Sequence, residues 1–122
     1  MRIAIALKDD GVTLAHFGHA ELFLVYDDGD GIFRLAEARR NNPPCGGEDS
    51  ETLMTASAGL VSDCAAVVAG RFGPCAVREI QQVRVFPFEW EGSLDRRLLT
   101  GLARMRNLLL GKNVGKERGR IS

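Results

Sequence analysis

The chain has 122 residues, of which 45% are hydrophobic and 26% are charged, so one domain with one hydrophobic core is the expected organisation. Its 16 Lys and Arg residues balance its 16 Asp and Glu residues, and this balance disfavours binding to nucleic acid or to a membrane surface through overall charge. The apolar run at residues 3–7 is too short for a signal peptide or a membrane span, which predicts a cytoplasmic protein.

Three β-strands are predicted in the first third of the chain. Residues 2–7 alternate large and small apolar side chains, as in a central strand that is covered on both faces. A second strand is predicted at residues 22–27, and the Asp-Gly-Asp-Gly turn at residues 28–31 leads into a third strand from residue 32 to about residue 39. These three strands are expected to form an antiparallel meander.

Helices and strands alternate in the rest of the chain. The predicted elements are a helix at 51–61, a strand at 65–69, a helix that begins at Pro74, a strand at 83–86 that Pro87 ends, and an amphipathic helix from Ser93 to Leu109. Residues 111–122 are rich in Gly, Lys and Arg, so we expect a domain at residues 1–110 followed by a flexible basic tail. The order β-β-β-α-β-α-β-α indicates an α/β domain with a five-stranded mixed sheet, in the order 3-2-1-4-5, whose second strand is antiparallel to the others and whose faces carry helices.

Three loops are expected to leave the same edge of this sheet. They follow the first, third and fourth strands, at residues 8–19, 39–47 and 70–75. The connections of the first and fourth strands diverge at this edge, which is where open α/β sheets bind ligands. The candidate cofactor-binding residues in these loops are His16, His19, Arg39, Arg40, Cys45, Arg71 and Cys75.

The three cysteines are expected to be reduced thiols, since their number is odd and none forms a C-x-x-C pair. Cys75 falls in the first turn of a predicted helix, where the helix dipole and free N–H groups stabilise a thiolate; the alternative is a small buried residue beside a tight turn. Cys45 lies between a proline and two glycines, so we expect it to be exposed and able to bind a metal. Cys64 precedes the fourth strand at the opposite end of the sheet and is expected to be a buried structural thiol.

The histidines and arginines of the three loops have two interpretations each. His16 and His19 could bind a metal or a cluster sulfide, or could be satisfied by loop carbonyls. The arginines could hold an anionic ligand through charge-assisted hydrogen bonds, or could be solvated. As metal ligands we assign His16, Cys45 and Cys75.

Four sequence features occur in order along residues 1–86. They are the string His16-Phe17-Gly18-x-Ala20-x-x-Phe23-x-Val25-Tyr26-Asp27, the loop Cys45-Gly46-Gly47, the pair Asp63-Cys64, and the turn from Gly70 to Gly73. In these features the chain resembles the nitrogenase iron-molybdenum cofactor biosynthesis family. The resemblance implies a ribonuclease-H-like fold and a protein that binds or carries an iron-sulfur or iron-molybdenum cofactor, or its precursor, during metallocluster assembly. It further implies a stand-alone carrier that lacks the radical enzyme domain of some relatives.

The residues themselves leave more than one function open. A nuclease of the ribonuclease H type is excluded, because the first and fourth predicted strands carry no acidic residues for two metal ions. A redox switch or thiol enzyme that joins Cys45 to Cys75 remains an alternative, as does a ligand-free interaction module that docks through its last helix. We expect an accessory carrier rather than an enzyme, a monomer or weak dimer whose partners are cofactor-assembly scaffold and acceptor proteins, without nucleic acid or membrane.

Overall fold

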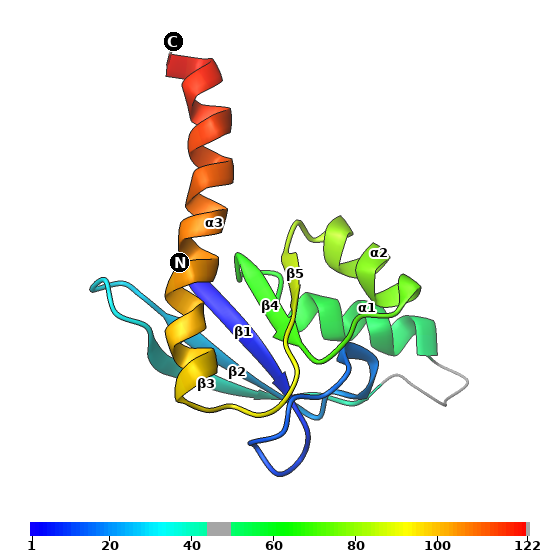
Figure 1. Cartoon of the computed structure of the whole chain (residues 1–122). Helices are drawn as coiled ribbons and strands as arrows, with labels where there is room; N and C mark the ends of the chain where they lie inside the picture. Colours follow the sequence, from blue (N-terminus) through cyan, green and yellow to red (C-terminus); the bar gives the residue numbers. More distant parts are fainter. Residues whose placement is uncertain (44–49, 122) are drawn as a thin grey trace.

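A single mixed sheet forms the centre of the protein (Figure 1). The computed structural model describes residues 1–43 and 50–121, with side chains at residues 1–43 and 52–111. The strands are β1 (Arg2–Leu7), β2 (Leu22–Asp27), β3 (Arg34–Arg40), β4 (Ala66–Ala69) and β5 (Phe86–Glu89). Their order is β3-β2-β1-β4-β5, with β2 antiparallel to both its neighbours and β4 parallel to β1 and β5. The predicted strand order and directions are therefore confirmed.

Helices cover both faces of this sheet (Figure 1). The helices α1 (Ser50–Leu60) and α2 (Pro74–Gln82) share one buried core with the sheet, and α3 (Arg96–Ile121) shares the other. β1 divides its side chains between the two, because successive residues of a strand point to opposite faces. Its large residues face α3, whereas Ala4 and Ala6 face α1 and α2. The small side chains let these two helices pack closely on the sheet.

The edge strand β5 differs from its prediction. The sequence predicts a strand at residues 83–86 that Pro87 ends, yet β5 spans Phe86–Glu89 and pairs Pro87 with Val67 of β4. A proline removes one N–H donor, which is costly in a central strand but tolerated at the edge of a sheet. The prediction was wrong because local sequence does not reveal which strand lies at the edge.

The residues before β5 end α2 in a Schellman motif. The N–H of Val85 donates to the carbonyl of Ile80 at 3.1 Å, and the N–H of Arg84 donates to that of Gln81 at 3.0 Å. Arg84 lies in the left-handed region with a φ of 60°, where glycine is favoured because it has no Cβ. The arginine is thus an unfavourable residue at this position.

We therefore expect Arg84→Gly to raise the free energy of unfolding by about 1 kcal/mol, through relief of the left-handed strain. Urea denaturation measures this change. Arg78→Gly, in the interior of α2, is the matched control and should lower stability by a similar amount. A destabilised Arg84→Gly variant would contradict the assignment of strain.

The last helix is longer than the amphipathic segment predicted from the sequence. Its buried side chains are Leu98, Leu102, Met105 and Leu109. Beyond them the backbone continues as a helix to Ile121 and projects past the sheet (Figure 1), where the sequence predicts a flexible tail. The domain boundary near residue 110 and the flexibility of the tail stay predictions. No helix within the described ranges has the length and apolar character needed to cross a membrane.

Candidate functional site

The two histidines lie on a short turn that is fixed to the carboxyl ends of β1 and β4. The N–H of Ala15 donates to Ala6 at the end of β1, and the N–H of Phe17 donates to Arg71 in the loop after β4, at 3.0 and 2.9 Å. Phe17–His19 then form one turn of 3₁₀ helix. The backbone that presents the imidazoles is therefore held by two strand ends.

A buried aromatic cluster anchors the same turn from below. Phe17 is fully buried, and its ring centroid lies 5.6 Å from that of Phe23 and 5.6 Å from that of Phe72. Phe23 belongs to β2 and Phe72 to the loop after β4. Aromatic contacts at such separations stabilise beyond the area that they bury. Phe17 therefore anchors the turn in the core, while His16 and His19 on either side of it stay exposed.

The exposed imidazoles line an open cavity of about 620 Å³. The ring centroids of His16 and His19 lie 6.0 Å apart with an interplanar angle of 65°. The other lining residues are Lys8, Asp9, Asp10, Glu21 and Pro43. The cavity therefore combines imidazole nitrogen, carboxylate oxygen and one ammonium group.

Two of the predicted arginines lie beside this cavity. Arg71 forms a parallel β-bridge with His16, and its side chain is exposed. Arg40 donates from Nη1 to Oδ1 of Asp9 at 3.1 Å, and Asp9 is one of the residues that line the cavity. The structure thus brings four of the seven predicted residues into one neighbourhood.

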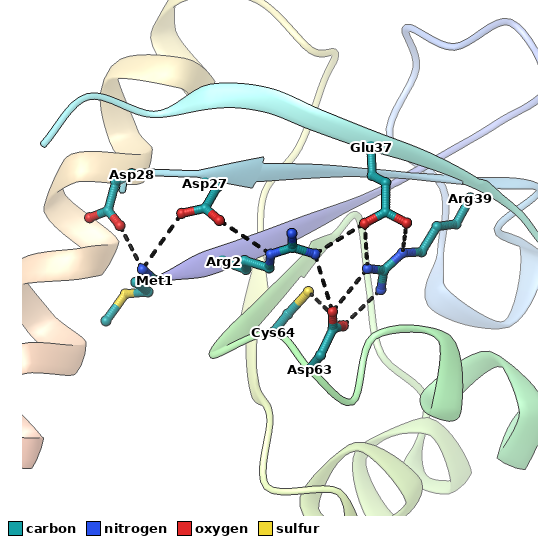
Figure 2. Close-up of polar contacts among 8 residues, drawn as sticks. All are labelled: Met1, Arg2, Asp27, Asp28, Glu37, Arg39, Asp63 and Cys64. Atoms are coloured by element: carbon teal, nitrogen blue, oxygen red, sulfur yellow. Dashed lines mark hydrogen bonds and ion pairs between the residues drawn. The ribbon is translucent and has the colours of Figure 1, made fainter. Parts of the chain in front are cut away.

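Arg39 lies elsewhere, in the ion-pair network of Figure 2. Its guanidinium forms a bidentate pair with Asp63 at 2.7 and 2.9 Å and contacts Glu37 at 2.9 and 3.1 Å. Hydrogen bonds from Arg39 hold the pKa of the Asp63 carboxyl well below its usual range, and those from Arg39 and Arg2 lower the pKa of Glu37. The structure therefore does not bring the Arg39 guanidinium together with the imidazoles, because neighbouring residues of a strand point to opposite faces and Arg39 pairs with Asp63 and Glu37.

The cysteines separate into three cases. Cys75 is exposed at the second position of α2, and Nη2 of Arg78 lies 3.8 Å from its sulfur. Cys64 is buried, as predicted, and burial raises the pKa of its thiol to about 12, with the adjacent Asp63 carboxylate as the next cause. Cys45 lies outside the described residues.

Two residues that the sequence analysis did not single out anchor the chain before Cys45. Asn41 donates from Nδ2 to the carbonyl of Ala20 at 2.8 Å, next to the histidine turn, and its Oδ1 accepts from the Oγ of Ser57 at 3.0 Å. Ser57 is fully buried in α1. The pair ties the end of β3 to the histidine turn and to α1. The one feature of the sequence that could have indicated this pair is Ser57, a polar residue among the apolar residues on the inner side of the helix predicted at residues 51–61.

The imidazoles of His16 and His19 and the thiol of Cys75 suit a ligand that is held by few protein atoms. Imidazole nitrogen and thiolate sulfur are ligands of iron and of iron-sulfur clusters. Within residues 1–43 and 52–111, however, no three His, Cys, Asp or Glu side chains are arranged to hold a metal ion. The imidazoles of the described part line a cavity that is open to solvent.

Comparisons with known proteins identify the family. The family model described as "Dinitrogenase iron-molybdenum cofactor" matches residues 1–99. Two similar curated proteins are both named FeMo cofactor biosynthesis protein NifB. The protein from Frankia alni is 30% identical over 98 residues, 77% of this chain, and the protein from Herbaspirillum seropedicae is 28% identical over 88 residues, 71% of this chain. The chain spans 19% and 17% of the length of these relatives.

Solved structures share the fold at low sequence identity. The NMR structure of a putative NifB protein from Thermotoga has a TM-score of 0.60 at 21% identity, over 84% of this chain and 87% of that chain. The apo form of the orange protein from Desulfovibrio gigas has a TM-score of 0.61 at 18% identity, over 83% and 85%. These structures confirm the α/β fold class. Since the family model matches most of the sequence, including the histidine turn and the loop after β4, this chain belongs to the dinitrogenase iron-molybdenum cofactor family.

Proposed function

We propose that this protein binds an iron-sulfur or iron-molybdenum cofactor, or a precursor of it, and carries it during metallocluster assembly as an accessory protein rather than an enzyme. The observation that carries the proposal is the pair of exposed imidazoles that line an open cavity from a turn hydrogen-bonded to the ends of two strands. The class of cargo is supported by the family and by the names of the two curated relatives.

The proposed ligands come from separate elements of the fold. His16 and Cys75, together with Cys45, would bind the metal, and His19 would assist from the same turn as His16. Arg40 and Arg71 would offset the negative charge of the cluster through charge-assisted hydrogen bonds. Arg39 has no part in this proposal, because its guanidinium is already paired with two carboxylates.

Carriage rather than retention is supported by the openness of the site. A carrier must release its cargo to an acceptor, and a closed cage of four cysteines would hold the cluster too firmly for transfer. A few donors on an exposed turn allow an acceptor to reach the cluster while it is still bound. The partners would be the scaffold and acceptor proteins of cofactor assembly in the cytoplasm.

Anaerobic titration tests the proposal, with a reconstituted [4Fe–4S] cluster and with isolated iron-molybdenum cofactor as the two probes. Absorption spectra and iron analysis measure the bound cluster. We expect His16→Ala combined with His19→Ala, and separately Cys75→Ala, to weaken binding of at least one probe by about ten-fold each, as loss of a metal ligand does. Both sets of side chains are exposed, so the thermal midpoint of unfolding should stay the same.

Cys64→Ala is the matched control, since it removes a buried thiol at the opposite end of the sheet, and it should keep the affinity. An unchanged titration for both the histidine and the Cys75 variants would refute the ligand assignment. A protein that binds neither probe, yet forms a reversible disulfide between Cys45 and Cys75, would support the redox switch instead.

A further inference from the structure

The outer face of α3 carries two arginines and a leucine that the fold does not use. Arg97, Arg104 and Leu108 follow one another at spacings of seven and four residues, which places them along one stripe of the helix. All three are exposed, and Leu108 is 62% exposed, the highest value among the large hydrophobic residues of the described chain. We call these three residues the arginine-leucine stripe.

The arginines of the stripe form no ion pair with the residues that the structure describes. In the described part of the chain, neither Arg97 nor Arg104 has a hydrogen bond or an ion pair. Arg106, on another side of the same helix, differs: it donates to Asp28 at 3.2 Å and lies 5.7 Å from the centroid of the Phe33 ring. The fold therefore uses Arg106 and leaves the stripe available to a partner.

The balanced overall charge conceals a strong asymmetry. α3 contains eight of the 16 Lys and Arg residues but one of the 16 Asp and Glu residues, so the rest of the chain is acidic. Such a basic helix on an acidic body attracts a negatively charged surface toward one side of the molecule.

The distal part of α3 lies beyond the buried side chains that the structure describes. Residues 110–121 extend the helix by about 18 Å at the usual rise per residue, beyond Leu109, the last buried residue among the side chains described up to residue 111. Three glycines, at positions 111, 115 and 119, favour the helix weakly. The family model ends at residue 99, so this extension is a feature of the chain beyond the matched part. A partner on the outer face would stabilise it.

We propose that the arginine-leucine stripe docks onto a partner protein whose surface has carboxylates beside an apolar patch. Arginine together with exposed apolar side chains is typical of protein interfaces. Nucleic acid is bound chiefly through cations against phosphates, to which an exposed leucine adds nothing, and the acidic body would repel it. This surface lies on the helix, outside the residues that line the imidazole cavity, so the proposal stands whether or not the protein carries a cluster.

Fluorescence anisotropy of labelled probes with the full chain tests this proposal. The probes are an amphipathic helical peptide of Glu and Leu, a peptide in which Ser replaces Leu, and a duplex DNA of similar net charge. The Glu/Leu peptide should bind most tightly and should weaken as salt is raised. Arg97→Gln with Arg104→Gln should weaken it by about ten-fold, and Leu108→Ser should abolish the preference for the Glu/Leu over the Glu/Ser peptide.

Matched controls keep the test decisive. Arg34→Gln with Arg84→Gln removes two exposed arginines outside α3 and should change the affinity by less than about two-fold. Arg97→Glu with Arg104→Glu should transfer the preference to a Lys/Leu peptide. The proposal is overturned if duplex DNA binds more tightly than the Glu/Leu peptide, if the two acidic peptides bind equally, or if the double glutamine variant binds as the unchanged protein does.

Discussion

Phe17→Ala should lower the free energy of unfolding by about 3–5 kcal/mol, the usual cost of emptying a phenylalanine site in a core. The ring is fully buried between Phe23 and Phe72, so its removal leaves a cavity that rigid neighbours cannot fill. Such a loss is a large fraction of the total stability of a domain. Because Phe17 begins the turn that carries the imidazoles, the variant should also bind the proposed cluster cargo poorly.

Urea denaturation followed by circular dichroism measures the stability of this variant. Phe17→Leu is the matched control, because leucine keeps most of the apolar volume and should cost about 1 kcal/mol. A loss below about 1 kcal/mol for Phe17→Ala would show that the turn does not depend on the aromatic cluster.

Arg39→Met should lower the free energy of unfolding by about 2 kcal/mol near neutral pH, after allowance for solvent screening of the half-exposed carboxylates. Arg39 bridges Glu37 and Asp63, and its own side chain is 16% exposed (Figure 2). Methionine keeps the unbranched apolar stem, so the change removes mainly the charge. Arg2, whose Nη1 donates to Glu37 at 3.0 Å and to Asp63 at 3.3 Å, would then have to offset the repulsion between the two carboxylates without Arg39.

The effect of this substitution should depend on pH in a defined direction. The pKa values of Asp63 and Glu37 are lower in the folded protein than their usual values. Their stabilisation is therefore fully present above about pH 5, where both carboxyls are largely ionised in the unfolded chain too, and is lost as the pH falls toward the folded pKa values. The difference between the unchanged protein and Arg39→Met should narrow steadily from about pH 5 to about pH 2.

Denaturation curves across that pH range check the prediction. Arg34→Met is the matched control, because it breaks an exposed pair with Asp30 at 2.9 Å and should leave the stability nearly unchanged. A penalty for Arg39→Met that is independent of pH would mean that packing, and not charge, is what Arg39 contributes.

The sequence alone was sufficient for the architecture. Alternation of side-chain size in β1, the glycine-rich turn after β2 and the order of the elements predict the mixed sheet, because periodicity reports which faces of an element are buried. The same reasoning placed the histidines at the carboxyl edge of the sheet and identified Cys64 as a buried thiol, both of which the structure confirms. These features depend on residues close together in the chain.

Contacts between distant segments were decided by the tertiary structure. Arg39 and Arg40 have different partners, although they are adjacent in β3. Pro87 is tolerated because β5 lies at the edge of the sheet. The hydrogen bond between Asn41 and Ser57 likewise depends on a neighbour that local sequence does not specify. The pairing of Arg39 with Asp63 joins residues 24 positions apart. Local sequence fixes the period and direction of each element, whereas the partner of a charged side chain is fixed once the elements have packed.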